Sequence, residues 1–209
     1  FFPTTEKMVK SFADVYRKSC ADIDVAALLL NRDEDYFFRK YAKKPQYITL
    51  TALEPYYSNF PWSAALEGKR VLIVHPFAKT ILSQYSKRRE LFSDSNVLPE
   101  FELITFKAVQ TIGSNTGGFS TWFDALEYMK NEIAKLEFDV AILGCGAYAF
   151  PLASHIKRIG KKAVIMGGAT QLLFGIKGKR WDDNPVISSL YNEAWVRPNE
   201  EDRPDGFEN

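Results

Sequence analysis

The chain has few of the residues that build metal centres or disulfide frameworks. Its 209 residues include two cysteines and two histidines, namely Cys20, Cys145, His75 and His155. This number is too small for a zinc cluster made of cysteine and histidine ligands. The sequence also shows no secretory signal peptide, so we expect two reduced thiols and a cytoplasmic location.

Long apolar runs and a charge excess are absent as well. The longest uninterrupted runs, such as Val25–Leu30 and Val71–Val74, fall far short of the roughly 18 residues that span a bilayer. We therefore expect no integral membrane segment. Lys and Arg total 27 against 26 Asp and Glu, a formal net charge of +1. A nucleic-acid-binding protein usually carries a clear basic excess, so we expect no nucleic-acid partner.

Several catalytic and binding motifs are also missing. The sequence contains no Gly-x-Ser-x-Gly elbow, Walker loop, His-Glu-x-x-His pair or EF-hand loop. Hydrolase and kinase functions thereby lose the motifs that would best support them.

The size and composition are typical of one soluble globular domain. Hydrophobic residues make up 46% of the chain and charged residues 25%, and a chain of this length buries roughly 70% of its surface on folding. We predict one domain over residues 1–209, with an acidic, proline-containing tail at 197–209. The chain starts at Phe1 rather than at a methionine, and we expect further residues upstream of it.

The spacing of apolar residues predicts alternating helices and strands. A helix capped by Thr4 or Thr5 opens the chain and is followed by Val25–Leu30, a strand that we expect to be covered on both faces. Further helices are predicted at 33–43, 77–92 and 121–136, the last of them entered through a capping box at Thr121–Asp124, with one more ending at Gly160. Further strands are predicted at 47–50, 71–74, 101–106, 139–143 and 162–166, and an irregular connection at 54–68. A flexible loop is predicted over the glycine-rich segment 113–118.

Units of about 30 residues that alternate strand and helix imply right-handed crossovers. The predicted fold class is α/β, with a Rossmann-like, mostly parallel sheet and helices on both of its faces, in a single domain.

The most informative segment is the turn after the predicted strand 139–143. Gly144 and Gly146 stand in the pattern Gly-x-Gly-x-x-Ala, followed by Ala147 and Tyr148 at the start of a helix. Such a turn directs backbone N–H groups and a helix dipole at a phosphate group. The alternative is that the glycines only allow close packing of helix and sheet. An NAD site is disfavoured, because no acidic residue ends the next predicted strand to bind the ribose.

Other strand ends should meet the Gly144 turn in one crevice, since ligands bind at the carboxyl ends of parallel strands. His75 ends one strand and is a candidate catalytic base. The alternative is a histidine that is hydrogen-bonded at a strand end before a proline. The residues after strand 162–166 are donor-binding candidates: Gly167, Gly168, Thr170 and Gln171.

Two further groups are candidates on weaker grounds. Lys179 and Arg180 stand beside Trp181, on a loop with Gly175 and Gly178 that could swing over the crevice and hold a diphosphate; the alternative is a solvated basic turn. Glu100 follows a proline that leads into a strand, and it is a candidate catalytic residue or an ordinary polar residue at a strand edge.

Nearly the whole chain resembles a bacterial protein family found with capsule and exopolysaccharide biosynthesis proteins, which is itself similar to GT-D-type glycosyltransferases. The segments that carry the resemblance are Val71–Phe77, Leu98–Leu103, Trp122–Met129, Gly144–Tyr148, Gly167–Trp181 and Tyr191–Pro198.

The resemblance implies a single-domain enzyme that moves a sugar from a nucleotide sugar, here a uridine diphosphate sugar, to a glycan acceptor. It implies a divalent cation, Mn²⁺ or Mg²⁺, held by an acidic motif that is not found here and that we expect upstream of residue 1. It also implies association with membrane-bound polysaccharide machinery. The alternative is a non-catalytic nucleotide-binding module of a polysaccharide assembly complex.

Overall fold

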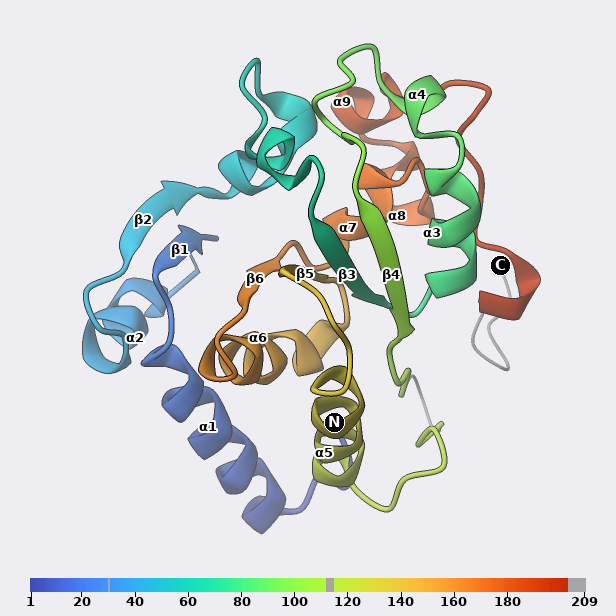
Figure 1. The fold of residues 1–209 in the computed structure, drawn as a ribbon. Helices are drawn as coiled ribbons and strands as arrows, with labels where there is room; N and C mark the ends of the chain where they lie inside the picture. The colour runs from blue at the N-terminus through green and yellow to red at the C-terminus, as the bar shows by residue number, and fades with distance from the viewer. Residues whose placement is uncertain (30, 112–114, 203–209) are drawn as a thin grey trace.

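A four-stranded parallel sheet forms the centre of the molecule (Figure 1). The computed structural model describes residues 1–29, 31–111 and 115–202. The strands are β3 (Arg70–His75), β4 (Glu102–Lys107), β5 (Val140–Leu143) and β6 (Lys162–Ile165), in the order β4-β3-β5-β6. All three pairings are parallel. This confirms the predicted α/β, Rossmann-like fold.

The two central strands are buried on both faces. All side chains of Val71–Val74 in β3 have no exposed surface, and those of Val140–Leu143 in β5 have at most 6%. Val71 and Ile73 belong to one apolar cluster, whereas Leu72 and Val74 belong to the other. Because successive side chains of a strand point to opposite faces, an uninterrupted apolar run fills both layers at once.

Helices cover both faces of this sheet, as predicted. On one face lie the elements that follow β3 and β6: α3 (Ala78–Tyr85), α4 (Arg88–Leu91), α7 (Ala169–Leu173), α8 (Lys179–Asp182) and α9 (Pro185–Ser188). On the other face lie α1 (Glu6–Cys20), α5 (Trp122–Ile133) and α6 (Ala149–Arg158). Figure 1 shows α5 and α6 below the sheet and α3 beside its upper part.

The order of the strands creates a switch point between β3 and β5. From β3 the chain passes through α3 to β4 on one side, and then through α5 to β5 on the opposite side of β3. The connections that leave the carboxyl ends of β3 and β5 therefore diverge to opposite faces. Ligands of open α/β sheets bind in the crevice at such a point.

The first two strands do not join this sheet. β1 (Val25–Leu28) and β2 (Gln46–Thr49) form a separate parallel pair connected by α2 (Glu34–Tyr41). The expectation that 25–30 is covered on both faces is therefore wrong for the described part of that segment: Val25 is 49% and Leu29 57% exposed. A two-stranded sheet has too few neighbouring elements to cover both of its faces.

The predicted helix 77–92 is also divided, into α3 and α4. The end of α3 is held by tertiary contacts, because Gln84 donates to the carbonyl of Ala194 at 2.9 Å and Tyr85 donates to that of Phe101 at 2.9 Å. The segment 54–68, predicted as irregular, contains short 3-10 turns: η2 (Pro55–Tyr57) and η3 (Trp62–Leu66), after η1 (Leu50–Leu53). Residues 112–114 of the predicted glycine-rich loop and 203–209 of the tail lie outside the described residues.

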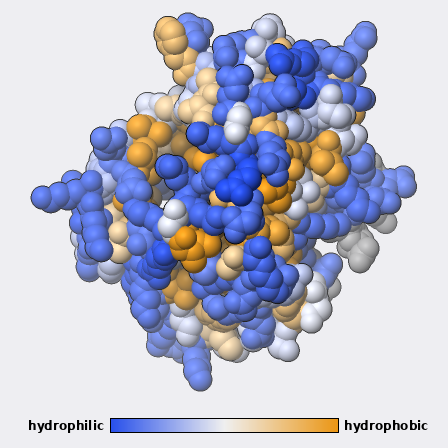
Figure 2. Space-filling model, in the orientation of Figure 1, coloured by the Kyte–Doolittle hydropathy of each residue, from blue (hydrophilic) through white to orange (hydrophobic). Residues whose placement is uncertain are grey.

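The face drawn in Figure 2 is mainly polar. Figure 2 shows hydrophilic residues over most of one face, with apolar residues in scattered groups. Among the described residues, no helix is both long enough and apolar enough to span a bilayer.

The helix caps predicted from local sequence are present. Thr5 caps α1, and a capping box joins Thr121 to Asp124 at the start of α5. In this box the Thr121 hydroxyl accepts from the Asp124 N–H at 3.2 Å, and the Asp124 carboxylate accepts from the Thr121 N–H at 2.9 Å. Gly160, with φ +82°, follows the end of α6.

We expect Thr121→Ala to lower the free energy of unfolding by about 1 kcal/mol, because the variant leaves an N–H group of the first turn without its acceptor. Urea unfolding followed by circular dichroism measures the change. Thr5→Ala serves as a comparison, since Thr5 makes one long cap contact of 3.4 Å on an exposed helix. A larger loss for Thr5→Ala than for Thr121→Ala would contradict the expectation.

Candidate ligand-binding site

Three predicted site segments meet at the carboxyl edge of the sheet. Gly144 donates its N–H to the carbonyl of Val74 at 2.9 Å, and Gly167 donates to that of Leu143 at 3.1 Å. The ends of β3, β5 and β6, with the turns that follow them, therefore lie side by side. The structure brings His75, the Gly144 turn and the Gly167 turn together, as the parallel arrangement predicted.

Gly144 is needed for packing. A Cβ atom at this position would lie 2.5 Å from Cδ2 of His75, 2.7 Å from the carbonyl oxygen of Gly167 and 2.7 Å from Oγ1 of Thr170. No larger residue fits between these groups. For Gly144 the structure thus favours the packing role over ligand contact.

Gly146 has the opposite surroundings. Its φ is +58°, and a Cβ atom there would meet nothing within 4 Å. Gly146 and Ala147 are exposed, and they begin η4 (Gly146–Tyr148), which leads directly into α6. The N-cap residue of α6, Tyr148, provides no side-chain cap. This turn leaves backbone and space open at the end of β5.

The ring of Tyr148 packs in the core next to that turn. Its ring is 4% exposed and stacks on Trp122, with the ring centroids 5.1 Å apart. On the same turn, Tyr16 of α1 donates its hydroxyl to the carbonyl of Ala147 at 2.7 Å. Tyr148 can therefore offer a ligand only its backbone, because its ring belongs to the core.

Arg180 lies against the turn after β6. A Cβ atom at Gly168 would lie 1.7 Å from its Nη2, and the centre of its guanidinium group is 3.8 Å from the centroid of the Trp181 ring. Arg180 lies beside the carboxyl edge, and both it and its neighbour Lys179, at the first position of α8, are exposed. The indole already stacks on this arginine, which reduces the ring surface open to a base or sugar.

The segment that carries Arg180 is not the hinged loop that the sequence predicted. Gly175 is buried, and a Cβ atom there would lie 2.6 Å from Cδ2 of Leu91. A Cβ atom at Gly178 would lie 2.6 Å from the Trp181 ring, and α8 begins one residue later. Both glycines are required by close packing, so they do not act as free hinges.

Thr170 and Gln171 differ in how their polar groups are used. Thr170 is fully buried, and its hydroxyl has no hydrogen-bond partner among the described residues. Gln171 donates its side-chain amide to the carbonyl of Ile176 at 3.0 Å, so it stabilises the chain that leaves α7. A buried hydroxyl without a hydrogen-bond partner is uncommon.

His75 is a buried, hydrogen-bonded residue at the end of β3. It is 3% exposed, and its Nδ1 accepts the N–H of Phe77 at 3.0 Å. Burial lowers the pKa of His75 to about 4, although the nearby carboxylate of Asp202 opposes part of the shift. The imidazole is therefore neutral at neutral pH and a weak base.

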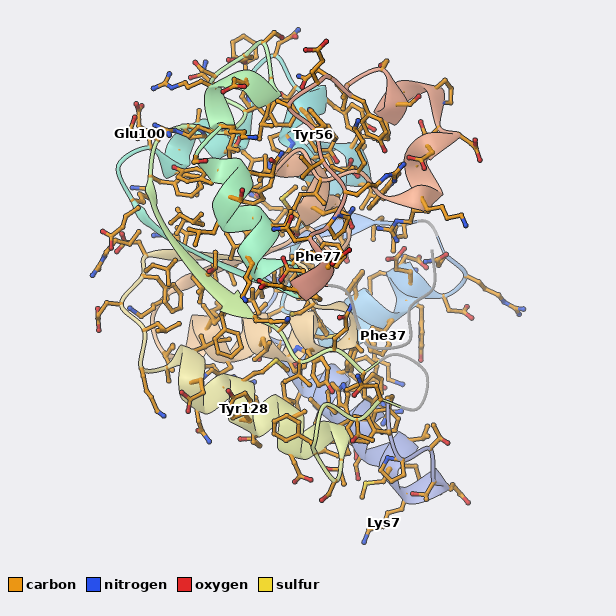
Figure 3. All side chains as sticks on the ribbon, turned by 90° about the vertical axis from the view of Figure 1, so that its right-hand side faces the viewer. Lys7, Phe37, Tyr56, Phe77, Glu100 and Tyr128 are labelled. Carbon is orange, nitrogen blue, oxygen red and sulfur yellow. The ribbon has the colours of Figure 1, made fainter. Side chains whose placement is uncertain are left out.

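Glu100 lies away from the other candidates. Its carbonyl accepts the N–H of Gly68 at 2.8 Å, before the start of β3, and its carboxylate pairs with Arg88 at 2.6 Å. In Figure 3, Glu100 lies near the start of β4. Phe77, which follows β3, lies near the other end of β4. The six residues of β4 span roughly 20 Å. A residue that precedes a parallel strand lies at the amino edge, and this rule could have excluded Glu100 from the crevice.

The sequence reasoning missed Asp202. This residue belongs to η5 (Glu200–Asp202) in the acidic tail, yet it is fully buried beside the start of α3. Its partner Thr80 is 122 residues earlier. No local pattern indicates a contact over that separation.

The described residues do not supply a metal site. In the ranges 1–29, 31–111 and 115–202, no group of three or more His, Cys, Asp or Glu residues is placed to hold a metal ion. Cys20 and Cys145 are both buried and unpaired. A hollow of about 200 Å³ lies on the outer β1–β2 unit, lined by Leu28, Asn31, Glu34 and Asp35; its two carboxylates do not suit phosphate.

In three comparisons with known proteins, no protein-family model, curated protein or solved structure matches the chain. Its function therefore has to be inferred from the site.

We expect the stability of the protein to fall between about pH 6.5 and about pH 4 because of His75. The pKa of His75 is lowered from its ordinary value of 6.5 to about 4 in the fold, so the unfolded chain takes up a proton first as the pH falls. The free energy of unfolding should lose up to about 3 kcal/mol across this window. Urea unfolding at half-unit pH steps measures it.

His75→Asn is the matched variant for this prediction. An asparagine Oδ1 can accept the Phe77 N–H in place of Nδ1, and the amide does not titrate. The difference between the pH profiles of the two proteins isolates the histidine. If the free energy of unfolding of the variant falls between pH 6.5 and 4 as steeply as that of the unchanged protein, His75 is not the source of the pH dependence.

Proposed function

We propose that the chain binds a nucleotide sugar at the carboxyl edge between β3 and β5 and transfers the sugar to a glycan acceptor, as a glycosyltransferase. The observation that carries this proposal is the open turn at Gly146, just before α6, at the switch point of the sheet. Three features support it: the electrostatics of the turn, the position of Arg180 and the family resemblance.

The start of α6 suits a phosphate group. N–H groups of the first turn of a helix have no partners within the helix, and aligned peptide dipoles place partial positive charge there. α6 has ten residues and no side-chain cap from Tyr148, but the Ala149 N–H donates to the Gly146 carbonyl and Pro151 has no N–H. A phosphate would therefore meet the exposed turn at Gly146 and Ala147 that precedes the helix. Because Gly146 has no side chain, a phosphate oxygen can approach the backbone directly.

Arg180 supplies a positive charge at the next turn along the edge. The contacts with Gly168 and Trp181 bring the exposed guanidinium to this edge before any ligand binds. A pre-positioned arginine loses less conformational entropy when it contacts phosphate, and it can make charge-assisted, bidentate hydrogen bonds. A diphosphate bound at the Gly146 turn would find its counter-charge there.

The family resemblance adds the sugar, the acceptor and the setting. It implies a uridine diphosphate sugar as donor, a glycan acceptor and association with membrane-bound polysaccharide machinery. Two reduced thiols fit a cytoplasmic location, where nucleotide sugars are available. We assign none of the described residues to the Mn²⁺ or Mg²⁺ that the resemblance also implies.

The second candidate function is nucleotide binding without turnover. Glu100 lies at the amino edge, and the neutral His75 has a pKa of about 4, far below the operating pH of an efficient general base. Neither predicted catalytic residue is therefore well suited to remove a proton at neutral pH. This favours a binding module within a polysaccharide assembly complex as the alternative.

Calorimetric titration with a panel of nucleotide sugars, with and without Mn²⁺, tests the binding step. Release of the nucleoside diphosphate in the presence of glycan acceptors tests turnover. Binding with release supports the transferase, and binding without release supports the module. No heat from any nucleotide sugar at millimolar concentration would refute both.

We expect Gly146→Val to weaken nucleotide-sugar binding at least tenfold, because a side chain at this position would stand where the phosphate approaches the turn. Gly160→Val is the matched control. Both glycines have positive φ, +58° and +82°, and open space at the Cβ position. Both variants should therefore lose similar stability, about 1–2 kcal/mol. Equal binding by the two variants would contradict ligand contact at Gly146.

Arg180→Ala and Gly168→Ala should both weaken nucleotide-sugar binding about tenfold and reduce its salt dependence. Gly168 has helical backbone angles, φ −65° and ψ −23°, so alanine fits the backbone and only displaces the end of Arg180. Calorimetry with a uridine diphosphate sugar and with free uridine separates the causes. If uridine weakens as much as the nucleotide sugar, the loss comes from the packing of Trp181 rather than from charge.

A further inference from the structure

The end of the described chain occupies the start of α3. Oδ2 of Asp202 accepts the backbone N–H of Thr80 at 2.6 Å and the hydroxyl of Thr80 at 2.7 Å. The same hydroxyl oxygen accepts the N–H of Asn199 at 2.9 Å. α3 has no side-chain cap from its own N-cap residue, Phe77. A distant carboxylate therefore takes the place that a local cap would fill.

Positive charge surrounds this carboxylate. Lys107, the last residue of β4, donates to the carbonyl of Glu201 at 2.8 Å and lies 4.0 Å from Oδ1 of Asp202. Lys79, in the first turn of α3, pairs with the carboxylate of Glu201 at 2.6 Å. The helix dipole adds partial positive charge at the same point. The start of α3 thus has the donors and charges of an anion site.

Asp202 uses only part of that site. The residue is fully buried, and its Oδ1 has no hydrogen-bond partner among the described residues. A buried carboxylate oxygen without a hydrogen bond is unfavourable. A phosphate group has more acceptor oxygens than a carboxylate, and it could contact the Thr80 donors and both lysines at once.

The position is also that of a substrate site. His75 pairs in register with Lys107, and α3 begins three residues after His75. The start of α3 and the Gly146 turn follow neighbouring strands at the switch point. A ligand bound at this edge would therefore lie between the two.

We propose that the start of α3 is a phosphate-binding site, formed by Thr80, Lys79 and Lys107, that Asp202 occupies in place of a substrate phosphate. Binding of the phosphate displaces Asp202 and releases the segment Asn199–Asp202, named here the tail strap. This inference rests on the proposed function for its substrate, because the phosphate comes from the nucleotide sugar or from a phosphate-bearing glycan acceptor. The affinity for phosphate is lowered by the carboxylate that has to leave.

Titration calorimetry with inorganic pyrophosphate tests the site directly. Asp202→Ala should bind pyrophosphate at least tenfold more tightly than the unchanged protein, because no carboxylate competes for the donors. Glu200→Gln is the matched control: it removes one negative charge from the exposed part of the tail strap, and its affinity should stay within twofold of the unchanged protein. Equal or weaker binding by Asp202→Ala overturns the proposal.

Two further variants keep the test decisive if Asp202→Ala unfolds. Asp202→Asn retains an acceptor for the Thr80 N–H and loses the charge, and it should bind pyrophosphate at least threefold more tightly than the unchanged protein. Adding Lys107→Ala to whichever Asp202 variant folds should remove most of the gain. If the whole gain in pyrophosphate affinity remains after Lys107→Ala, the pyrophosphate binds elsewhere and the assignment is overturned.

Titration with uridine diphosphate and with a sugar 1-phosphate identifies the source of the phosphate. Tighter binding of the nucleotide by Asp202→Ala assigns the site to the donor, and tighter binding of the sugar phosphate alone assigns it to the acceptor. If pyrophosphate binding improves but no nucleotide sugar binds any variant, the proposed function fails and the α3 site stands. If nucleotide sugars bind while Asp202→Ala improves nothing, the α3 site fails and the proposed function stands.

Discussion

The parallel pairing of β3 with β5 is the interaction on which the rest of the structure depends. Val71–Val74 are paired residue by residue with Val140–Leu143, and both runs are buried on both faces. Each strand supplies side chains to both apolar layers, so the pairing aligns the two halves of the core at once. Parallel direction then brings the carboxyl ends of the strands, and the helices that follow them, to one edge.

Backbone N–H groups at the carboxyl edge need hydrogen-bond acceptors, and the two helix starts at this edge differ in how these are supplied. At the start of α3 the Thr80 N–H donates to the carboxylate of Asp202, and the Phe77 N–H donates to Nδ1 of His75. The N-cap residue of α6, Tyr148, provides no side-chain cap, and the turn before α6 is exposed at Gly146. The start of α3 already binds a carboxylate, whereas the turn before α6 is open. Helix N-termini attract anions, so this edge is a candidate site for an anionic ligand.

Features set by neighbouring residues could be predicted well. The Thr121–Asp124 capping box, the Gly160 helix end and the buried strand at 71–74 each depend on residues within one turn or one strand. The sharing of one edge by His75, Gly144 and Gly167 also followed from the predicted parallel sheet, because parallel strands end on the same side. The predicted helix over 77–92 is instead divided into α3 and α4, and at the end of α3 Gln84 and Tyr85 contact distant segments.

The amino-acid sequence alone determined the class of the fold and the identity of the edge, because hydrophobic periodicity and turn residues act over short distances. Only the tertiary structure decided which residues share the site. Arg180 comes to rest on Gly168, and Asp202 reaches Thr80 from 122 residues away. The contact of Asp202 depends on how the last third of the chain packs on the central sheet, and no local propensity encodes a contact over that separation.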